Sequence, residues 1–279
     1  MTDAGSDWGY GSASGGAMRA YEETLVGPLF VPWAHVLCDE LALQRGEALL
    51  DVATGPGTLA RVAAARLGAS GAVTACDVSP AMLALASEKP SLADAAPIDY
   101  LECSALSLDV PDGAFDVVAC QQGLQFFPDR PVAVSEMARA LKPGGRMGVA
   151  VWASIERCPP IAALGRAIAV VMGENIAARY QNGPWGFSDG DALAALLGEA
   201  GFEEVRVEEH HLPVTFEAGA SQLLASLTAS GIAAEVAQLD PGERRALTDE
   251  ATAMLGPLVA DGRVVSTMAS NIALAVKPA

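Results

Sequence analysis

The sequence predicts an α/β fold with a mostly parallel β-sheet and helices on both of its faces. Apolar runs of strand length alternate with amphipathic segments of helix length from residue 48 to residue 152. This alternation is typical of right-handed crossovers and a parallel sheet. A glycine-containing turn joins the first apolar run to the first helical segment. The chain has 279 residues and 51% hydrophobic content, which is enough for a full core.

The first predicted strand, residues 48–52, is apolar except for Asp51. A carboxylate in a buried strand is costly unless backbone N–H groups or a ligand bind it. Gly55 and Gly57 follow this strand and precede a helix predicted over residues 58–66. Glycines at such a turn adopt backbone angles that other residues avoid, and they let a ligand touch the backbone. The stretch therefore predicts a ligand site where the first strand ends.

Three interpretations of this turn compete. Gly55, Gly57 and Ala60 match the dinucleotide pattern G-x-G-x-x-G/A, with Asp77 downstream as the ribose acid. The spacing Asp51-x-x-x-Gly55-x-Gly57 resembles instead the S-adenosylmethionine (SAM) loop of class I methyltransferases. Asp51 favours the second interpretation, because dehydrogenases usually keep that position of the first strand apolar. A tight turn that binds no ligand is the third.

The other core elements follow in chain order. A second strand ends in Asp77, and Ser79 is placed to cap the next helix, with Pro80 in its first turn. A later helix, residues 131–141, is stopped by the Lys-Pro-Gly-Gly sequence at 142–145. The strands predicted after the first lie at residues 72–77, 98–102, 114–120, 146–152, 202–213 and 264–276.

Five segments within residues 45–152 resemble, in the same order, those of class I SAM-dependent methyltransferases of the ubiquinone/menaquinone C-methyltransferase-like group. They are LDVATGPG (50–57), DVSPAML (77–83), PDGAFDVV (111–118), QQGLQFFPD (121–129) and EMARALKPGG (136–145). A single match would be weak, but five in order are specific. The resemblance implies a Rossmann-like sheet of seven strands, whose last strand lies antiparallel beside the sixth, and SAM as the cofactor.

The resemblance also implies roles for individual residues. Asp51 matches the acid that binds the methionine ammonium, and Asp77 the acid that binds the ribose. Ala53 stands where many relatives have glycine, and Ser104 where many have aspartate. The residues expected to bind the cofactor are Tyr21, Asp51, Ala53, Gly55, Gly57, Asp77, Val78, Met82, Ser104, Ala105 and Gln121. We expect Asp77→Ala to weaken SAM binding by about 1–3 kcal/mol and to change the stability of the ligand-free protein little.

The rest of the chain is expected to form a cap over the site. The predicted segments are a flexible tail (1–16), N-terminal cap helices (17–45), the SAM-binding core (46–153), a cap insertion (154–187) and the end of the sheet (188–279) with a helical insertion at about 218–258. The N-terminal helices have two interpretations, a lid over the cofactor or ordinary packing at the sheet edge. The residues expected to bind the methyl acceptor are Trp33, Gln125, Trp152 and Trp185.

Histidines are the candidates for a general base, which a hydroxyl or amine acceptor would use. His210 and His211 are the expected catalytic residues, with His35 as a further candidate. Adjacent residues on a strand project to opposite faces, so at most one of His210 and His211 would face the site. No metal is expected, because no His, Asp or Glu cluster has the spacing of metal ligands.

Charge and cysteine content limit the classes of partner and the cell compartment that fit this sequence. A net charge of −17 and a pI of about 4.4 argue against nucleic-acid or anionic membrane surfaces. Five scattered cysteines without a C-x-x-C pair favour reduced thiols in a cytoplasmic protein. The first sixteen residues contain no Lys or Arg, unlike a signal peptide. No window of the sequence offers the uninterrupted apolar residues of a membrane span. A monomer or homodimer is expected.

The expected function is methyl transfer from SAM to an oxygen, nitrogen or carbon atom of a small-molecule acceptor, in bacterial secondary metabolism. Two alternatives stay open. One is a SAM-binding cyclase or pericyclase of the same fold, whose product would gain no methyl group. The other is a nicotinamide-dependent dehydrogenase, which would bind NAD in place of SAM. The acceptor itself is not predicted, because the cap that would select it varies.

Overall fold

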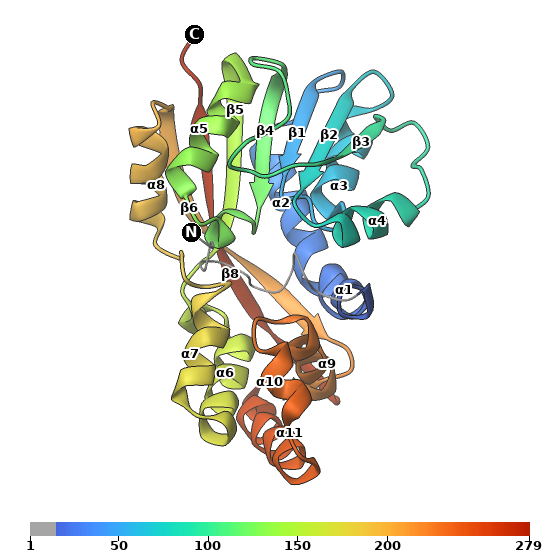
Figure 1. Ribbon diagram of the computed structural model, residues 1–279, viewed down its shortest axis with the longest axis vertical. Coiled ribbons are helices and arrows are strands. Elements are labelled where there is room, and N and C mark those ends of the chain that lie inside the picture. The colour runs from blue at the N-terminus through green and yellow to red at the C-terminus, as the bar shows by residue number, and fades with distance from the viewer. Residues whose placement is uncertain (1–14) are drawn as a thin grey trace, which may run out of the picture.

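The computed structural model describes residues 15–279, with side chains from Met18 onward. The predicted flexible tail therefore lies outside the described residues, apart from residues 15 and 16 at the start of helix α1. Figure 1 shows a sheet with helices on both faces and, below it, a separate group of helices at the far end of two long strands. The division of the chain into the expected segments stays a prediction.

The described residues form one mixed sheet with the strand order β3-β2-β1-β4-β5-β8-β6 (Figure 1). Strands β1 to β5 pair in parallel, whereas β8 runs antiparallel to both β5 and β6. A two-residue strand, β7, adds to β8. The predicted Rossmann-like sheet with an antiparallel last strand beside the sixth is confirmed. The strands are β1 (Ala48–Val52), β2 (Ala72–Asp77), β3 (Ile98–Glu102), β4 (Phe115–Gln121), β5 (Leu141–Trp152), β6 (Glu203–Phe216), β7 (Val259–Ala260) and β8 (Arg263–Val276).

Successive residues of a central strand enter different cores, because the side chains of a strand alternate between its faces. Leu49 packs with the core under α2 (Val31–Glu40) and α3 (Thr58–Leu67). Leu50 packs with the core under α5 (Arg130–Ala140) and α8 (Gly190–Glu199). Both leucines are fully buried. A parallel sheet covered on both faces explains why β1 reads as a continuous apolar run.

Side-chain caps set the starts of three core helices. Ser79 accepts a hydrogen bond from the Met82 N–H at the start of α4 (Pro80–Glu88), as predicted. Asp129 accepts from the Val132 N–H at the start of α5. Asp189 accepts from two N–H groups of α8. Each capped helix begins directly beyond a turn at one end of the sheet, so the caps fix the turns that surround the site.

Two 14-residue strands, β6 and β8, extend beyond the sheet and carry a helical cap at their far end (Figure 1). The helix α6 packs against α11 within this cap. The cap helices are α6 (Pro159–Met172), α7 (Glu174–Asn182), α9 (Ala220–Ser226), α10 (Ala233–Gln238) and α11 (Pro241–Leu255), with the short turn η4 (Leu227–Ala229) between α9 and α10. Asp240 and Glu243 form a capping box at the start of α11.

The N-terminal segment is one helical run with a change of pitch. Helix α1 (Gly15–Tyr21) continues into a π-helical segment, η1 (Glu22–Phe30), and then into α2. Pro28 lies inside η1, where its missing N–H leaves one fewer hydrogen bond to satisfy. The run is therefore continuous and does not separate into isolated helices at Pro28 and Pro32.

Two elements differ from the sequence prediction. Helix α7 continues through Tyr180 to Asn182, where the sequence of residues 180–187 predicts a loop, and Ala177 and Tyr180 bury its inner face. Strand β5 begins at Leu141, five residues earlier than expected, because Leu141 pairs with Phe115 ahead of a register shift in β4. In the described part of the chain, no helix has the length and apolar character needed to cross a membrane.

Candidate functional site

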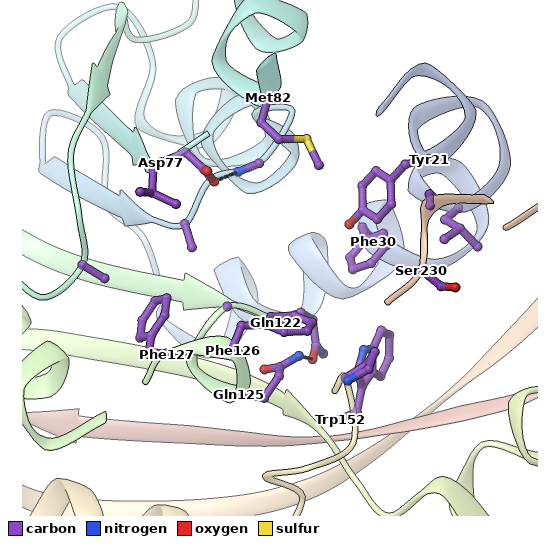
Figure 2. Close-up of a pocket in the computed structure, with 18 of the residues that line it drawn as sticks. Tyr21, Phe30, Asp77, Met82, Gln122, Gln125, Phe126, Phe127, Trp152 and Ser230 are labelled. Carbon is purple, nitrogen blue, oxygen red and sulfur yellow. Dashed lines mark hydrogen bonds between the residues drawn. The ribbon is translucent and has the colours of Figure 1, made fainter. Parts of the chain in front are cut away.

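A cavity of about 470 Å³ lies at the edge of the sheet where β1, β2, β4 and β5 end. Parallel strands bring these ends together, and this edge is the usual ligand crevice of open α/β sheets. Figure 2 shows Asp77 and Met82 across the cavity from Gln122, Gln125 and Trp152. We call the side around Asp51, Ala53, Gly55 and Asp77 the cofactor end. The aromatic side, formed by Phe30, Trp152, Tyr180 and Trp185 with Gln125, is the acceptor end.

The turn after β1 uses left-handed backbone angles. Ala53 has a φ of 60°, Gly55 of 55° and Gly57 of 78°. A Cβ atom on Gly57 would lie 3.0 Å from the Tyr100 hydroxyl, so tight packing also requires glycine there. A Cβ on Gly55 would meet no protein atom within 4 Å. Because Gly55 lines the cavity, its bare backbone is left open to a bound molecule.

Asp51 is buried in β1, with 1% of its surface exposed. Its Oδ2 accepts a 2.6 Å hydrogen bond from the Thr54 hydroxyl, whereas its Oδ1 has no partner among the described residues. Burial raises the pKa of Asp51 to about 7, nearby Asp77 adds to the rise, and the Thr54 hydroxyl and Ala60 N–H oppose it. The carboxylate thus keeps an unsatisfied oxygen in a dry place, which a cationic ligand group would stabilise.

Asp77 holds the turns on both sides of it. Its Oδ2 accepts the Gly55 N–H at 2.8 Å, and its Oδ1 accepts the Ser79 N–H at 2.9 Å. Burial raises the pKa of Asp77, although these N–H groups and that of Val78 act in the opposite direction. Asp77 therefore joins the glycine turn to the start of α4 even without a ligand, in contrast to the assumption behind the expected small effect on stability.

The remaining predicted cofactor residues lie around these acids. Met82 is buried, Val78 is exposed, and both line the cavity with Ser104 and Ala105. The Ser104 hydroxyl accepts the Leu106 N–H at 3.1 Å, so it stabilises its own turn. Gln121 lines a smaller adjoining cavity of about 70 Å³ with Tyr21 and Asp51. The Gln121 Nε2 donates to the Phe30 carbonyl, which ties β4 to the N-terminal helices.

Aromatic rings from distant segments meet at the acceptor end. The rings of Trp152 and Trp185 stack with centroids 6.3 Å apart, and Phe30 meets Trp152 edge-on at 6.0 Å. Tyr180 lies 6.2 Å from Trp185. Of the described residues that line the cavity, Asp77 alone has a charged side chain. The acceptor end therefore suits a flat, uncharged molecule.

Besides Gly57, which shapes the turn but lines neither cavity, three predicted site residues lie elsewhere. Trp33 is buried behind Trp152, with ring centroids 6.0 Å apart, and does not line the cavity. Neither His210 nor His211 lines it, because β6 is an edge strand separated from the end of β5 by β8. His211 instead contacts Glu209 at 2.8 Å, and His210 lies 3.9 Å from Glu40. The expected catalytic role of the two histidines is corrected accordingly.

Sequence reasoning missed several residues that line the cavity. Phe126 and Phe127 belong to a recognised segment, so their position after β4 was an available signal. Ser226, Ala229 and Ser230 come from the end of α9, the end of η4 and the position after it, and they carried no signal, because they are small residues in a variable insertion. Among the described residues, no three His, Cys, Asp or Glu side chains group as metal ligands would.

Comparison with known proteins adds a family to this geometry. The model of the ubiE/COQ5 methyltransferase family matches residues 29–218. A demethylmenaquinone methyltransferase of Thermus thermophilus is 36% identical over 184 residues, covering 61% of this chain and 80% of that protein. One of Listeria monocytogenes is 31% identical over 196 residues, covering 65% of this chain and 81% of that protein. The residues that the family model matches contain the whole sheet edge that forms the cofactor end.

A solved structure shows the same fold over nearly the whole chain. Phosphoethanolamine N-methyltransferase 2 of Haemonchus contortus, solved in complex with S-adenosyl-L-methionine, is similar with a TM-score of 0.59 and 19% sequence identity. The similarity covers 95% of this chain and 58% of that chain. At this identity the likeness concerns the fold alone.

Proposed function

The chain belongs to the ubiE/COQ5 methyltransferase family, and from this premise we propose that its methyl acceptor is a neutral, ring-shaped hydroxy compound of the reduced-quinone type. The family and the relatives make the protein a SAM-dependent methyltransferase acting on a small molecule. This settles the choice between SAM and NAD in favour of SAM. A role in secondary metabolism stays a prediction.

The side chains at the cofactor end fit SAM. Asp51 and Gln121 each keep a buried side-chain oxygen without a partner among the described residues, and both line the same small cavity. Such oxygens suit an ammonium group, and we assign both residues to the methionine end of the cofactor. Asp77 would bind the ribose, with Val78 and Met82 beside the adenine. When bound, SAM supplies an electrophilic methyl group on a cationic sulfur.

The observation that carries the choice of acceptor is the lack of charge at the acceptor end. Once Asp77 is assigned to the cofactor, no described lining residue remains to neutralise a phosphate, carboxylate or ammonium group. Burying such a charge without a partner costs roughly several kcal/mol of binding free energy. Flat aromatic walls instead favour a ring that stacks on them. Two relatives are named as demethylmenaquinone methyltransferases, and this name supports an acceptor with a quinone-derived ring.

The ring must be in its dihydroxy form to react. A quinone ring is poor in electrons, whereas hydroxyl groups make the neighbouring ring carbons nucleophilic. No His, Lys or Arg is found among the described lining residues, so we assign no side-chain base, and the proton that the methyl group displaces from the ring carbon leaves to solvent. We propose that the chain accelerates transfer by aligning the acceptor and by excluding water, since alignment alone can supply several kcal/mol, roughly.

The test offers the purified protein SAM with either dihydroxynaphthalene or phosphoethanolamine. We expect mass spectrometry to find a methyl group added to dihydroxynaphthalene and none added to phosphoethanolamine. Transfer to phosphoethanolamine alone would overturn the neutral acceptor. A cyclase of the same fold would bind SAM and release products without an added methyl group, and no feature of the cavity favours that alternative.

A further inference from the structure

Gln125 presents a buried amide with one oxygen unused. The residue lies in the short turn η2 (Leu124–Phe126), lines the cavity, and has only 4% of its surface exposed. Its Oε1 has no hydrogen-bond partner among the described residues. An unsatisfied buried carbonyl costs about 1–3 kcal/mol, so such a group in a native site calls for an explanation. A bound molecule that donates a hydrogen bond would supply the missing partner.

The orientation of an amide is usually ambiguous, because its oxygen and nitrogen ends have the same shape. In Gln125 a chain of hydrogen bonds removes the ambiguity. The chain starts at the backbone carbonyl of Val151, which can only accept. The Ser270 hydroxyl donates to this carbonyl at 2.7 Å. Because that hydroxyl has spent its hydrogen, it can only accept from the next group in the chain.

The next group is the amide of Gln122, which must therefore present its nitrogen to Ser270. Its Nε2 donates to the Ser270 Oγ at 3.0 Å. The Gln122 Oε1 is then the end that faces Gln125, and it accepts the Gln125 Nε2 at 3.3 Å (Figure 2). The Gln125 nitrogen is thus committed, and its oxygen is the end left for a ligand.

The backbone around this chain is held firmly. Gln122 has a left-handed φ of 56°, a strained angle for glutamine, and its N–H donates to the Ala150 carbonyl at 2.8 Å. Strain of this kind persists only where the surroundings enforce it, and it clusters at functional sites. Arg130 donates to the carbonyls of Leu124 and Gln125. The amide of Gln125 is therefore fixed from both its side chain and its backbone.

We propose that Gln125 Oε1 accepts a hydrogen bond from a hydroxyl or N–H group of the methyl acceptor, and that Ser270 and Gln122 are positioning residues that keep this oxygen turned to the ligand. The inference rests on the proposed function and narrows it. The site requires a donor group on the acceptor, so it selects against rings in which every hydroxyl is already methylated. A site built around a hydrogen bond rejects a partner that lacks it far better than one built on shape.

The test measures binding and needs no turnover. Calorimetric titration compares dihydroxynaphthalene with dimethoxynaphthalene, which lacks a donor, on the protein saturated with S-adenosylhomocysteine. We expect the wild type to bind the dihydroxy compound at least about tenfold more tightly. In Gln125→Met, which keeps the volume, the preference should fall below about twofold while S-adenosylhomocysteine affinity stays unchanged.

Ser270→Ala tests the positioning role. With no hydroxyl to fix Gln122, the amides are free to turn, and the preference should drop to about threefold, whereas Ser270→Thr should restore it. Gln222→Met is the matched control, because the Gln222 amide donates to the Thr24 carbonyl and does not line the cavity. It should keep the full preference.

Two results would overturn the role of Gln125 and leave the proposed neutral acceptor intact. They are equal wild-type affinity for both naphthalenes, or an unchanged preference in Gln125→Met. If the complex with S-adenosylhomocysteine binds neither compound, the proposed neutral acceptor fails, and the inference fails with it. The two failures are distinguishable, because the first leaves tight binding of neutral rings intact.

Discussion

The two ends of the cavity are built in different ways. The cofactor end comes from short local segments, in which a strand, a left-handed turn and a helix start place Asp51, Gly55 and Asp77. Hydrogen bonds between backbone N–H groups and single carboxylates hold that end together. The acceptor end gathers rings from Phe30, Trp152 and Trp185, which are far apart in the sequence. One end is organised by individual polar contacts and the other by collective packing.

This difference separates what each end should contribute. A charged hydrogen bond acts on one ligand at one position. A substitution at the cofactor end should therefore change the affinity for SAM and leave the acceptor end almost unaffected. Aromatic packing acts on the fold and on the acceptor together. The four predictions below run from the largest expected effect to the smallest, and each can break this separation.

Removal of the Trp152 side chain should have the largest effect. Trp152 is 3% exposed and contacts the rings of Phe30, Trp33 and Trp185, so Trp152→Ala should lower the free energy of unfolding by about 3–5 kcal/mol. Urea denaturation measures this loss. Trp152→Phe, the control, should lose much less. If Trp152→Ala instead abolished S-adenosylhomocysteine binding while keeping its stability, the two ends would not be separable.

The second prediction concerns pH and Asp51. The folded-state pKa is about 7, above the ordinary value of 3.8, so the folded protein holds this proton more tightly than the unfolded chain does. The free energy of unfolding of the ligand-free protein should therefore fall as pH rises from about 4 to about 7. The full cost, roughly 2–4 kcal/mol, should be present above pH 7.

Asp51→Asn should remove most of that slope, leaving the part that Asp77 supplies because its pKa is also raised, and should be more stable than the wild type at about pH 8, while binding SAM more weakly. Urea denaturation over a pH series measures both variants. Asp99→Asn, at an exposed position of β3, should keep the wild-type slope. A parallel decline in the wild type and Asp51→Asn would show that the buried carboxylate is not the cause.

The third prediction concerns Asp77. Asp77→Ala should weaken binding of S-adenosylhomocysteine by about 1–3 kcal/mol, through lost charged hydrogen bonds. Its thermal midpoint should also fall, because the Gly55 and Ser79 N–H groups lose their acceptor. Asp77→Asn keeps one acceptor oxygen and should lie between the two proteins in both measurements. Unchanged affinity in Asp77→Ala would place the ribose elsewhere.

The same contrast explains how far the sequence could predict the molecule. All five parallel strands were predictable, because their apolar runs and turns are local, whereas the antiparallel last strand was expected only from the family resemblance. Asp51 and Asp77 were predictable for the same reason. His210 was misplaced because β8 inserts between β5 and β6, a tertiary choice that no local pattern records. Ser270 could not be predicted at all, since it reaches Gln122 across 148 positions of the chain.

The smallest effect should come from the contact between the N-terminal helices and α4. The Lys89 Nζ lies 2.7 Å from Glu22 Oε1 and donates to the Pro56 carbonyl at 2.8 Å, so it joins η1 to the glycine turn. A second pair, Arg19 with Glu88, lies beside it and is exposed. Partly exposed ion pairs stabilise by about 0.2–1 kcal/mol, which is enough to bias a local opening but not to unfold the chain.

Lys89→Ala should therefore raise amide hydrogen exchange over residues 18–30 and speed release of S-adenosylhomocysteine by roughly two- to fivefold. The control is Lys142→Ala, whose ammonium pairs with Asp116 at the other end of β4 and does not line the cavity. It should change neither quantity.

Bound S-adenosylhomocysteine should in turn protect residues 18–30, because the helices close over it. If the ligand protected only the glycine turn, and Lys89→Ala released it no faster, the N-terminal helices would be ordinary packing at the sheet edge. The N-terminal helices would then respond to neither ligand binding nor the loss of Lys89, and the cofactor end would act independently of the helices beside it.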